Sequence, residues 1–424
     1  MMAGKNQKSE GAKTHPLEGL RVLDLGIGAV GVEVGRLFAE YGADVIKVET
    51  TASLDFIRGI MGGVMNPPFA SSNRTKRSFG INLKTKQGQK LMDRLVKSTD
   101  VIIENSAPGV MERIGLGYER VRKLNPRTVM ISSQLLGKTG AWSHWVGYGP
   151  STHPVSGLSY LWNFPEDSDR PSGSQNIYPD HLIGRLGALL AVAGLIQRER
   201  TGKGSHGEIA QFEVPIGLMG DLFLQESLQA GSAVPRGNRS QRGAPWGAYR
   251  CKGEDEWCVI NVRSDDEWDR LRAVLGNPAW ARSKRYRTAQ DRLSHQDELD
   301  GRISKWTGSR TSRQVMTMLQ RRGIPAGMVQ HPRDQTEDPH LAKRGFLRPI
   351  RQYPIGRIIL EGPAFHSTRI AEPIIRPAPE LGEHNQEICV GFLKMSKREV
   401  KELMAKGILE MSQEAKEKAK KRGK

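Results

Sequence analysis

Short apolar runs alternate with longer, mixed segments along the first third of the chain. Leu20–Leu25 (LRVLDL) and Ala43–Val48 have the length and composition of buried strands, and Glu33–Tyr41 between them is helical in pattern. The alternation continues with strands expected within Asn73–Leu83 and at Asp100–Glu104 and Thr128–Ser133, and with a helix at Gln87–Ser98. Strands that alternate with helices predict an α/β fold, with a parallel sheet and helices on both of its faces.

The longest apolar run in the chain is Leu182–Ile196, which is charged only at Arg185. It is too short to span a bilayer, so it predicts a helix buried in the protein core that ends near Gly202. Asp180 therefore stands at the beginning of a buried helix. As the N-cap, its carboxylate would accept backbone N–H bonds. As a nucleophile, it would be held on a rigid element at the edge of the core. The two roles are compatible.

Composition narrows the class of protein. The chain has 424 residues, of which 37% are hydrophobic and 26% charged, as expected for a globular protein of two domains. No uninterrupted apolar run reaches the length of about 18 residues that indicates a membrane span. The three cysteines have no metal-ligand spacing and are odd in number, which favours free thiols in a reducing cytoplasm. The polar N-terminus lacks the apolar core of a signal peptide and indicates a disordered leader.

The formal net charge of +18 is spread over the chain, with a further basic cluster at Lys416–Lys424. Nucleic-acid binding is one explanation of such a charge. The sequence has no zinc-finger spacing, recognition-helix signature or aromatic-interleaved basic motif, so that explanation is not favoured. A small anionic substrate that carries several phosphates is served equally well by a diffuse positive field.

The segment Gly26–Gly31 (GIGAVG) follows the first expected strand, and Glu49 ends the second. This is the spacing of the dinucleotide-binding fingerprint, and it also resembles the first motif of methyltransferases that bind S-adenosylmethionine. The motif alone leaves NAD, S-adenosylmethionine and other nucleotide-bearing ligands open. Parallel sheets bind ligands at the carboxyl ends of their strands, which is where Gly28, Glu49, Asn105 and Gln134 are expected.

Several longer segments are more specific. They are, in chain order, VLDLG with YGADVIKVE, KRSFGINLKTKQG, DVIIENSAPGVMERIGLGYERVRKLNPR, YPDHLIG, RERTGKGSHGEIA, GNRSQRGAPWGAYRCKGEDEWCVI, GIPAGMVQ, DPHLAKRGF, GPAFHST and PELGEHNQEI. Over about 16–410, the chain resembles the family III CoA-transferases, which include formyl-CoA transferase and the carnitine and bile-acid CoA-transferases. So many motifs in the same order identify the family better than any one of them.

The resemblance implies a function and a set of site residues. The family moves CoA from an acyl-CoA donor to a carboxylic acid acceptor, through an anhydride and an aspartyl-CoA thioester, without a metal or redox cofactor. Its catalytic aspartate falls on Asp180. Its CoA-binding positions fall on Gly28, Ala29, Lys84, Asn105 and Arg113.

The resemblance also implies an architecture. A large Rossmann-like, CoA-binding domain would be built from both chain ends, at 16–225 and 331–410, with a small α+β domain at 226–330. A leader at 1–15 and a basic tail at 411–424 would lie outside both domains. A tryptophan-rich middle and an expected strand at 259–262 agree with the small domain. Two chains of this family interlock into a homodimer.

The chain departs from the family pattern at several positions. Val30-Gly31-Val32 replaces Ala-Gly-Pro, Thr50 and Thr51 stand where an arginine often meets the nucleotide end of CoA, and the polyglycine lid of formyl-CoA transferase is absent. Oxalate or formate specificity is therefore not supported, and a catalytically degenerate CoA-binding homologue stays an alternative. The related α-methylacyl-CoA racemase needs a His-Asp pair that Gly147–Thr152 lacks, which disfavours racemisation.

Five aromatic residues precede Asp180 in a loose cluster: Trp142, Trp145, Tyr148, Tyr160 and Trp162. They are candidates for the lining of a pocket that takes an aromatic or bulky acyl group. A loop packed over the core explains them equally well. The sequence names neither the acyl donor nor the acceptor.

Overall fold

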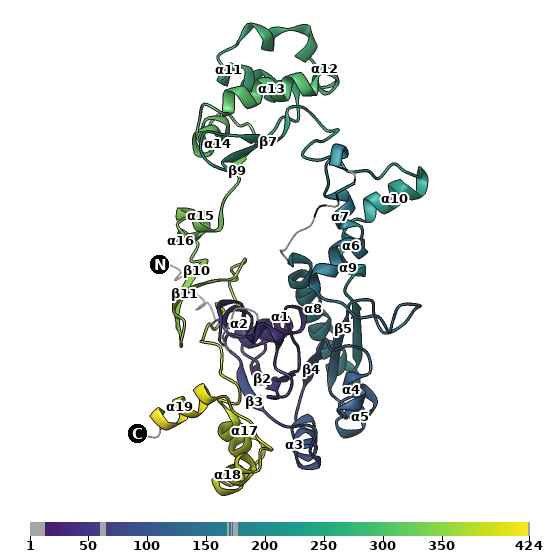
Figure 1. Cartoon of the computed structure of the whole chain (residues 1–424), viewed down its shortest axis with the longest axis vertical. Coiled ribbons are helices and arrows are strands. Elements are labelled where there is room, and N and C mark those ends of the chain that lie inside the picture. The colour runs from purple at the N-terminus through teal and green to yellow at the C-terminus, as the bar shows by residue number, and fades with distance from the viewer. Residues whose placement is uncertain (1–12, 60–64, 168, 171, 173–176, 423–424) are drawn as a thin grey trace, which may run out of the picture. The chain divides into compact units, whose positions relative to one another are not determined.

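The structure is a computed structural model that describes residues 13–59, 65–167, 169–170, 172 and 177–422. It consists of two compact units. The large unit comprises Met1–Leu158, Ser174–Gly220 and Ala342–Lys424, and the small unit comprises Ser159–Gly173 and Asp221–Leu341 (Figure 1). The large unit is thus built from both ends of the chain, and most of the small unit from its middle.

Six parallel strands form the centre of the large unit. They are β1 (Arg21–Asp24), β2 (Asp44–Glu49), β3 (Arg77–Gly80), β4 (Val101–Glu104), β5 (Val129–Gln134) and β6 (His206–Ala210). Their order in the sheet is β3-β2-β1-β4-β5-β6, and every neighbouring pair is parallel. The expected parallel sheet is confirmed, and its order is that of a doubly wound, Rossmann-like fold. The order reverses between β1 and β4, which leaves a crevice for ligands at their carboxyl ends.

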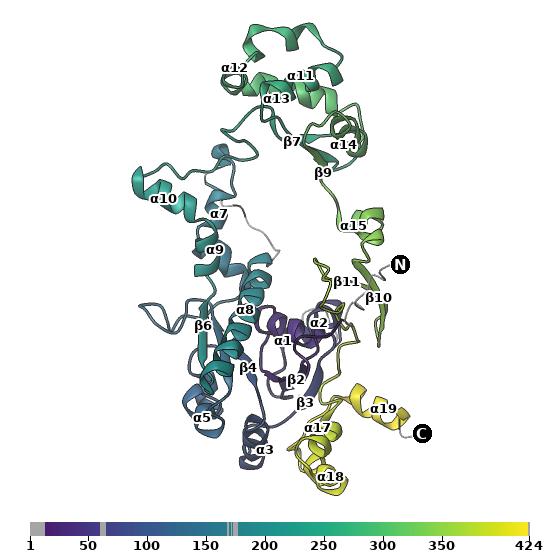
Figure 2. The same cartoon turned by 180° about the vertical axis from the view of Figure 1, so that it is seen from behind.

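Helices cover both faces of the sheet. One hydrophobic core joins the strands to α3 (Lys86–Val96), α17 (Asn385–Gly391) and α18 (Lys397–Ala405), and a second joins them to α1 (Val30–Glu40) and α8 (Tyr178–Thr201). Neighbours such as Val22 and Leu23 belong to different cores, because successive side chains of a strand point to opposite faces. Seen from behind, α17 from near the C-terminus lies beside β3 from the N-terminal part, and α18 packs on α17 (Figure 2).

Shorter elements complete the large unit. They are α2 (Pro67–Ser72), α4 (Val110–Arg113), α5 (Tyr118–Leu124), α6 (Thr152–Val155), α9 (Glu213–Leu218), the antiparallel pair β10 (Leu347–Gln352) and β11 (Gly356–Glu361), and α19 (Gln413–Arg422) in the basic tail. Lys418 attaches α19 through an ion pair with Glu383 at 3.1 Å. Of the leader expected at 1–15, residues 1–12 lie outside the described residues, and Thr14 pairs with Ile370.

Helix α8 begins before its apolar run. Pro179 occupies its first turn, where a missing N–H is tolerated, and Gly202 ends it in the left-handed conformation, as expected. The N-cap residue is Ile177, which has no side chain to cap the helix. The interpretation of Asp180 as the N-cap is therefore wrong, because Asp180 is the third residue of the helix, within its first turn, and Ile177 precedes the helix.

The expectation that α8 is buried holds for one side only. Gly187 packs on Val34 of α1, and Gly194 packs on Val129 of β5. On the other side, Leu189 and Ile196 are 66% and 52% exposed. Among the described helices α8 alone is long and apolar enough to cross a bilayer, a weak criterion that core helices of soluble proteins also meet. Its packing makes α8 a covering helix of the sheet.

The small unit is built on an antiparallel sheet of β7 (Trp246–Arg250), β8 (Trp257–Asn261) and β9 (Ala326–Met328). The main helices that pack with this sheet are α11 (Asp265–Val274), α13 (Gln296–Thr307) and α14 (Ser312–Gln320). Trp268, Tyr286 and Leu299 are buried in the core that they share.

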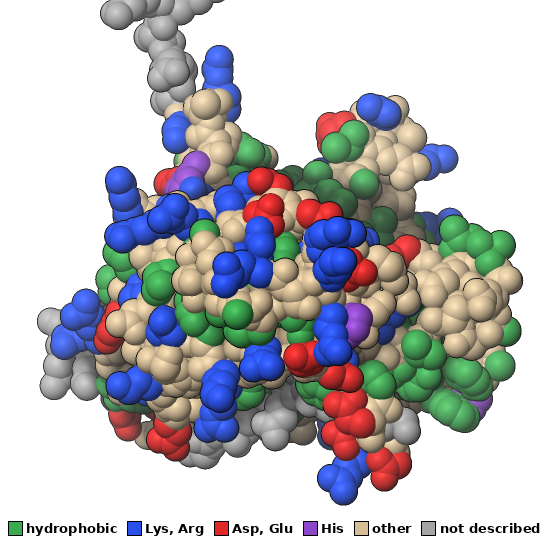
Figure 3. Space-filling model, turned by 90° about the horizontal axis from the view of Figure 1, so that it is seen from above, with side chains coloured by type: hydrophobic (Ala, Val, Ile, Leu, Met, Phe, Trp, Pro, Cys, Tyr) green, Lys and Arg blue, Asp and Glu red, His purple; other side chains and the backbone are tan. Residues whose placement is uncertain are grey.

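Charge is distributed unevenly between the units. Basic and acidic residues are nearly balanced in the small unit, so most of the net charge of +18 belongs to the large unit. Figure 3 shows Lys and Arg side chains spread over one face of the molecule, with Asp and Glu among them. A mixed surface of this kind differs from the basic stripe that is typical of nucleic-acid binding.

Candidate active site

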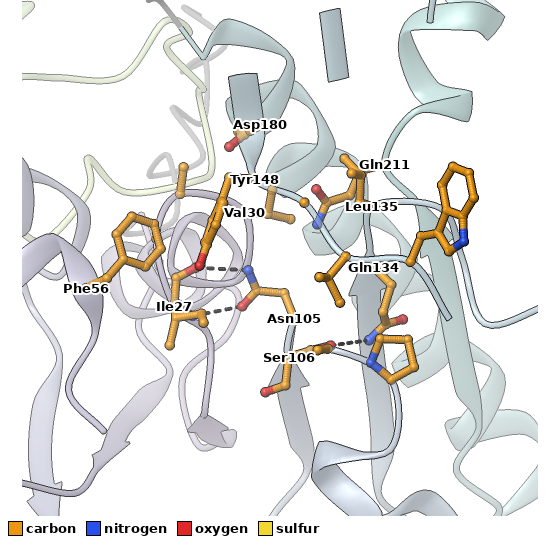
Figure 4. Close-up of a pocket in the computed structure, with 18 residues that line it drawn as sticks. Ile27, Val30, Phe56, Asn105, Ser106, Gln134, Leu135, Tyr148, Asp180 and Gln211 are labelled. Atoms are coloured by element: carbon orange, nitrogen blue, oxygen red, sulfur yellow. Dashed lines mark hydrogen bonds between the residues drawn. The ribbon is translucent and has the colours of Figure 1, made fainter. Parts of the chain in front are cut away.

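A cavity of about 390 Å³ lies at the carboxyl ends of β1, β4 and β5 (Figure 4). Its lining consists of Ile27, Gly28, Ala29, Val30, Phe56, Asn105, Ser106, Ala107, Pro108, Gln134, Leu135, Trp145, Val146, Gly147, Tyr148, Gly149, Asp180 and Gln211. The segment Trp145–Gly149 after β5 supplies the largest share, followed by the loop after β4 and the β1–α1 loop. This is the crevice in which a doubly wound sheet binds its ligands.

The β1–α1 loop needs glycine at two positions. Gly28 has a φ of 70°, and a Cβ there would meet the ring of Phe56 at 2.8 Å. A Cβ at Gly31 would meet Oδ1 of Asn105 at 2.7 Å. The glycines of the fingerprint therefore allow the side chains of Phe56 and Asn105 to close on this loop.

Asn105, which directly follows β4, holds the loop through both groups of its side chain. Its Oδ1 accepts from the N–H of Ile27 at 2.8 Å, and its Nδ2 donates to the carbonyl oxygen of Ile27 at 2.9 Å (Figure 4). Asn105 thus positions the turn that contains Gly28 and Ala29. All three of these predicted CoA-binding residues line the cavity.

A buried ion pair, which the sequence did not suggest, holds the same loop. Oδ1 of Asp55 accepts from the N–H of Gly28 at 2.9 Å, and its Oδ2 lies 3.0 Å from Nζ of Lys47. Lys47 also donates to the carbonyl oxygen of Gly26. Burial alone would raise the pKa of Asp55, but Lys47 and the N–H groups lower that pKa below its ordinary value. The signal in the sequence was a lysine in the middle of an otherwise apolar strand.

Asp180 lines the cavity from the first turn of α8. It is 5% exposed, and its Oδ1 has no hydrogen-bond partner among the described residues. Burial raises the pKa of Asp180 to about 6, and the charge of His181 acts in the opposite direction. Such a carboxylate is largely ionised at neutral pH and has few bonds to break before it attacks a substrate.

Gln134, the last residue of β5, lines the cavity with a fixed amide orientation. Its Nε2 donates to the carbonyl oxygen of Ser106 at 3.2 Å (Figure 4). The same nitrogen donates to Oε1 of Glu104 at 3.1 Å. Both partners are acceptors, so the amide cannot be reversed. Its Oε1 is buried and has no partner among the described residues. Gln134 therefore keeps an unused hydrogen-bond acceptor at the cavity.

Lys84 and Arg113 lie outside the cavity. Lys84 is exposed in the loop between β3 and α3, and Arg113 is exposed at the end of α4, with Nη1 3.2 Å from the position of a Cβ on Gly109. Both follow carboxyl ends of strands, on the same edge of the sheet as the cavity. The cavity itself brings together four of the predicted site residues, namely Gly28, Ala29, Asn105 and Asp180.

Glu49 is not a free acid at the end of β2. Its two oxygens accept from Nε and Nη2 of Arg58, each at 2.8 Å, and both residues are buried. The ring of Phe69 covers the same guanidinium group. A dinucleotide-binding fold needs this acid for a ribose hydroxyl. The pairing with Arg58 therefore argues against NAD as the ligand.

Two of the five aromatic residues singled out from the sequence, Trp145 and Tyr148, line the cavity, and the other three do not. Phe56 joins them, with its ring centroid 5.7 Å from that of Tyr148 in an edge-on contact. Trp142 stacks on Trp145 at 5.7 Å without lining the cavity. Only part of the aromatic cluster therefore lines the cavity, so the predicted acyl pocket is confirmed for Trp145 and Tyr148 as cavity lining alone.

No group of three or more His, Cys, Asp or Glu side chains is arranged to hold a metal ion in the part of the chain that the structure describes. The three cysteines, Cys251, Cys258 and Cys389, are buried free thiols. Burial raises the pKa of Cys258 and of Cys389 to about 12. These thiols are therefore unreactive at neutral pH.

Fold and site together define an α/β enzyme with a buried carboxylate in the ligand crevice of its sheet. The chain belongs to CoA-transferase family III, whose family model matches residues 17–385. The resemblance carried by the sequence motifs is thereby confirmed.

Individual relatives agree with this assignment. The chain is 36% identical over 405 residues to a probable CoA-transferase of Mycobacterium tuberculosis, with 93% of this chain but only 50% of that protein covered. It is 32% identical over 400 residues to the succinyl-CoA–D-citramalate CoA-transferase of Chloroflexus aurantiacus, with 93% of this chain and 98% of that protein covered. A solved CaiB/BaiF family protein from Brucella suis has a TM-score of 0.82 and 26% identity, over 90% of this chain and 100% of that one.

Proposed function

We propose that this protein transfers CoA from an acyl-CoA donor to a carboxylic acid, with the Asp180 carboxylate as nucleophile. One observation carries the proposal. Asp180 lines the cavity, is 5% exposed and keeps one oxygen without a partner among the described residues. Membership of the family and the names of its relatives support the reaction class.

In the first half-reaction, an oxygen of Asp180 attacks the thioester carbonyl carbon of the donor. The C–S bond breaks, CoA leaves as a thiolate with the bonding electrons, and a mixed anhydride joins the acyl group to Asp180. The thiolate then attacks Cγ of Asp180. The anhydride C–O bond breaks, the donor acid departs as a carboxylate, and CoA remains on Asp180 as a thioester.

The second half-reaction runs these steps in reverse with the acceptor. The acceptor carboxylate attacks Cγ of Asp180, the thiolate leaves, and a new anhydride forms. The thiolate attacks the acyl carbon of the acceptor, and Asp180 is released as a carboxylate. No proton is gained or lost overall, which suits a lining that contains no histidine, lysine or arginine among the described residues.

The cavity would protect the intermediates, because water hydrolyses both anhydrides and thioesters. Gly149 brings the main chain against the carboxylate of Asp180. Asn105 and Asp55 hold the β1–α1 loop through Ile27 and Gly28. The reacting groups would thus meet in a preorganised site.

CoA would bind in two parts. Its uncharged pantetheine arm would enter the cavity over Gly28 and Ala29. Its phosphates would stay outside, near the exposed side chains of Lys84 and Arg113, because cationic side chains hold phosphate oxygens well. The positive charge of the large unit supports an anionic ligand and would raise its rate of encounter.

The functional form would be a cytoplasmic, interlocked homodimer. Its large CoA-binding domain would span 16–225 and 331–410, and its small α+β domain 226–330. Free, buried cysteines are consistent with a reducing compartment. Light scattering should give twice the chain mass of 47.1 kDa at every dilution, because interlocked chains separate only when they unfold. A monomer mass would contradict this assembly.

The covalent step is tested by isotope exchange between a labelled free acid and its acyl-CoA. Asp180→Ala should lower the exchange rate by at least about 1,000-fold, as expected for loss of a nucleophile. Hydroxylamine added during turnover should trap wild-type Asp180 as a hydroxamate, which mass spectrometry of that peptide would detect. Asp221→Ala removes an exposed acid from the first turn of α10 (Gly220–Leu228) and serves as the matched control. Full exchange in Asp180→Ala would refute the proposal.

A further inference from the structure

We infer that the acyl group carried by this enzyme is uncharged and apolar, with room for an aromatic ring, and has no second carboxylate. The inference rests on the proposed function and adds the substrate class. The relative from Chloroflexus aurantiacus is named for succinyl-CoA and D-citramalate, both of which bring an additional carboxylate. The cavity of this chain favours a different kind of acyl group.

The wall beside Asp180 is apolar and partly aromatic. The ring of Tyr148 contacts that of Phe56, and the next residue, Gly149, touches Asp180. Cδ2 of Leu135 lies 2.3 Å from the position of a Cβ on Gly147, so Leu135 closes the wall behind this segment. In Figure 4, Phe56 and Tyr148 lie on one side of Asn105, and Leu135 lies on the other. Flat, apolar groups bind well between such side chains.

No cation is available in the cavity to pair with a second carboxylate. Asp180 is the only residue charged at neutral pH among the described residues that line it. Another carboxylate would therefore be desolvated beside a like charge, without a partner. Exclusion of this kind discriminates between substrates as effectively as attraction does.

Basic side chains close to the cavity in sequence are paired with acids instead. Arg185 and His181 of α8 lie 3.2 and 3.5 Å from the carboxylate of Glu33. Lys138, after β5, lies 3.5 Å from that of Glu104. Recruiting any of them for a substrate would cost a buried glutamate one of its charged partners.

The fixed amide groups of Gln134 and Asn105 are equally unsuited to a second carboxylate. The amide nitrogen of Gln134 is bonded to Glu104 and Ser106, and both groups of Asn105 are bonded to Ile27. Oε1 of Gln134 is left as an acceptor, which repels carboxylate oxygens and welcomes an N–H donor. The amide groups of pantetheine are donors of this kind.

The first experiment compares acceptors with the wild-type protein. Exchange into CoA is measured for phenylacetate, acetate and succinate, each against its own acyl-CoA. The kcat/KM for phenylacetate should exceed that for succinate by at least tenfold. A value for succinate that equals or exceeds that for phenylacetate overturns the inference and leaves the proposed function standing.

A second experiment does not depend on turnover. Asp180→Asn cannot form the anhydride, so its binding of phenylacetyl-CoA and succinyl-CoA can be compared by calorimetry. We expect phenylacetyl-CoA to bind at least tenfold more tightly. Equal affinities, or the reverse order, overturn the inference even if the wild type shows no exchange. Absence of exchange with every acid in the wild type would instead refute the proposed function.

Two tryptophans of similar exposure provide a matched pair of variants. Trp145 lines the cavity and is 54% exposed, whereas Trp142 is 51% exposed and does not line it. Trp145→Ala should lower kcat/KM for phenylacetate at least tenfold and that for acetate less than threefold. Trp142→Ala should change either value less than threefold. Equal losses for phenylacetate in the two variants would overturn the assignment of Trp145 to the acyl group.

A gain-of-charge variant tests the electrostatic argument directly. Val146 lines the cavity and is 70% exposed, so substitution there does not threaten the core. Val146→Lys should raise the ratio of kcat/KM for succinate over phenylacetate at least fivefold, while Val146→Met should leave that ratio unchanged. An unchanged ratio in Val146→Lys would show that charge does not govern the choice and would overturn the inference.

Discussion

The carboxylate of Asp180 lies against the α-carbon of Gly149. A Cβ built on Gly149 would meet Oδ2 of Asp180 at 2.2 Å and Oδ1 at 2.8 Å, which is closer than any real side-chain contact. Any larger residue at this position must therefore displace the carboxylate, the loop or both. The conformation of Gly149 is ordinary, so the requirement for glycine is one of space alone.

Gly149→Ala should consequently impair catalysis more than stability. A displacement of about 1 Å at a reacting group lowers rates by roughly 100-fold, and we expect a loss of kcat of that order. Gly220→Ala is the control, because a Cβ on Gly220 would meet nothing within 4 Å. Steady-state kinetics of both variants, with thermal melts to verify folding, decide the matter. A folded Gly149→Ala variant with normal kcat would show that the carboxylate does not react in this position.

The pH dependence of the reaction should report the buried carboxylate. Burial raises the pKa of Asp180 to about 6, and only the ionised form attacks. The kcat/KM for acyl-CoA should therefore fall about tenfold for each pH unit below about 6 and level off above it. Measurement from pH 4.5 to 8 in a constant-ionic-strength buffer would give the midpoint. A midpoint near 4, as for a solvated aspartate, would contradict the buried environment.

The same group should affect stability with a defined sign. The folded-state pKa of about 6 lies above the ordinary 3.8, so ionisation of Asp180 disfavours folding. The protonated carboxyl group of Asp180 makes its full contribution to stability below pH 4, and this contribution is lost as the pH rises through 6. Two pKa units correspond to about 3 kcal/mol. Asp180→Asn should thus be more stable than the wild type at pH 8, by an amount that shrinks towards pH 4, as measured by urea unfolding. A variant that is less stable at pH 8 would contradict the assigned direction.

The sheet and the family could be predicted from the sequence because their signals are local. Each strand is a short apolar run, and the glycines of Gly26–Gly31 are fixed by close packing with Phe56 and Asn105. Helix ends were less certain. Helix α8 begins at Tyr178, before the apolar run, and its N-cap Ile177 has no capping side chain, so a pattern of capping residues places the N-cap at Asp180 instead.

Pairing across the fold is what the sequence could not supply. The position of Glu49 at the end of a strand suggested a ligand contact, but its carboxylate forms a buried pair with Arg58. Trp142 and Trp145 are three residues apart, yet only one of them lines the cavity. Such outcomes depend on the path of the chain in three dimensions. The main contribution of the structure is therefore to exclude residues that the sequence alone suggests as ligand contacts or cavity lining.

The contact between Gln134 and Glu104 offers a test of the fixed amide. Gln134→Glu would bring two carboxylates to about 3 Å, and we expect a loss of about 3 kcal/mol in the free energy of unfolding. Glu104→Gln in the same chain exchanges the two groups and should restore more than half of that loss. Urea unfolding of the two single variants and the double variant measures the coupling. Additive losses would show that the two side chains do not interact.

Lys84 and Arg113 lie at the edge of the sheet that carries the cavity, and their exposed side chains make no hydrogen bond or ion pair among the described residues. If they hold the phosphates of CoA, Lys84→Ala and Arg113→Ala should each raise the KM for acyl-CoA about tenfold, corresponding to about 1.4 kcal/mol, and leave kcat nearly unchanged. Added salt should weaken the binding of acyl-CoA more in the wild type than in these variants. Salt screens the contacts between cationic side chains and phosphates, and each variant has already lost one of these contacts. Lys90→Ala, on the exposed side of α3, is the control for a general change in charge.

Acyl-pantetheine, which has no phosphate, should react with equal KM in the wild type and in the three variants. A tenfold rise in KM for acyl-pantetheine in either variant would indicate distortion of the site, and an unchanged KM for acyl-CoA would remove that residue from the CoA-binding set.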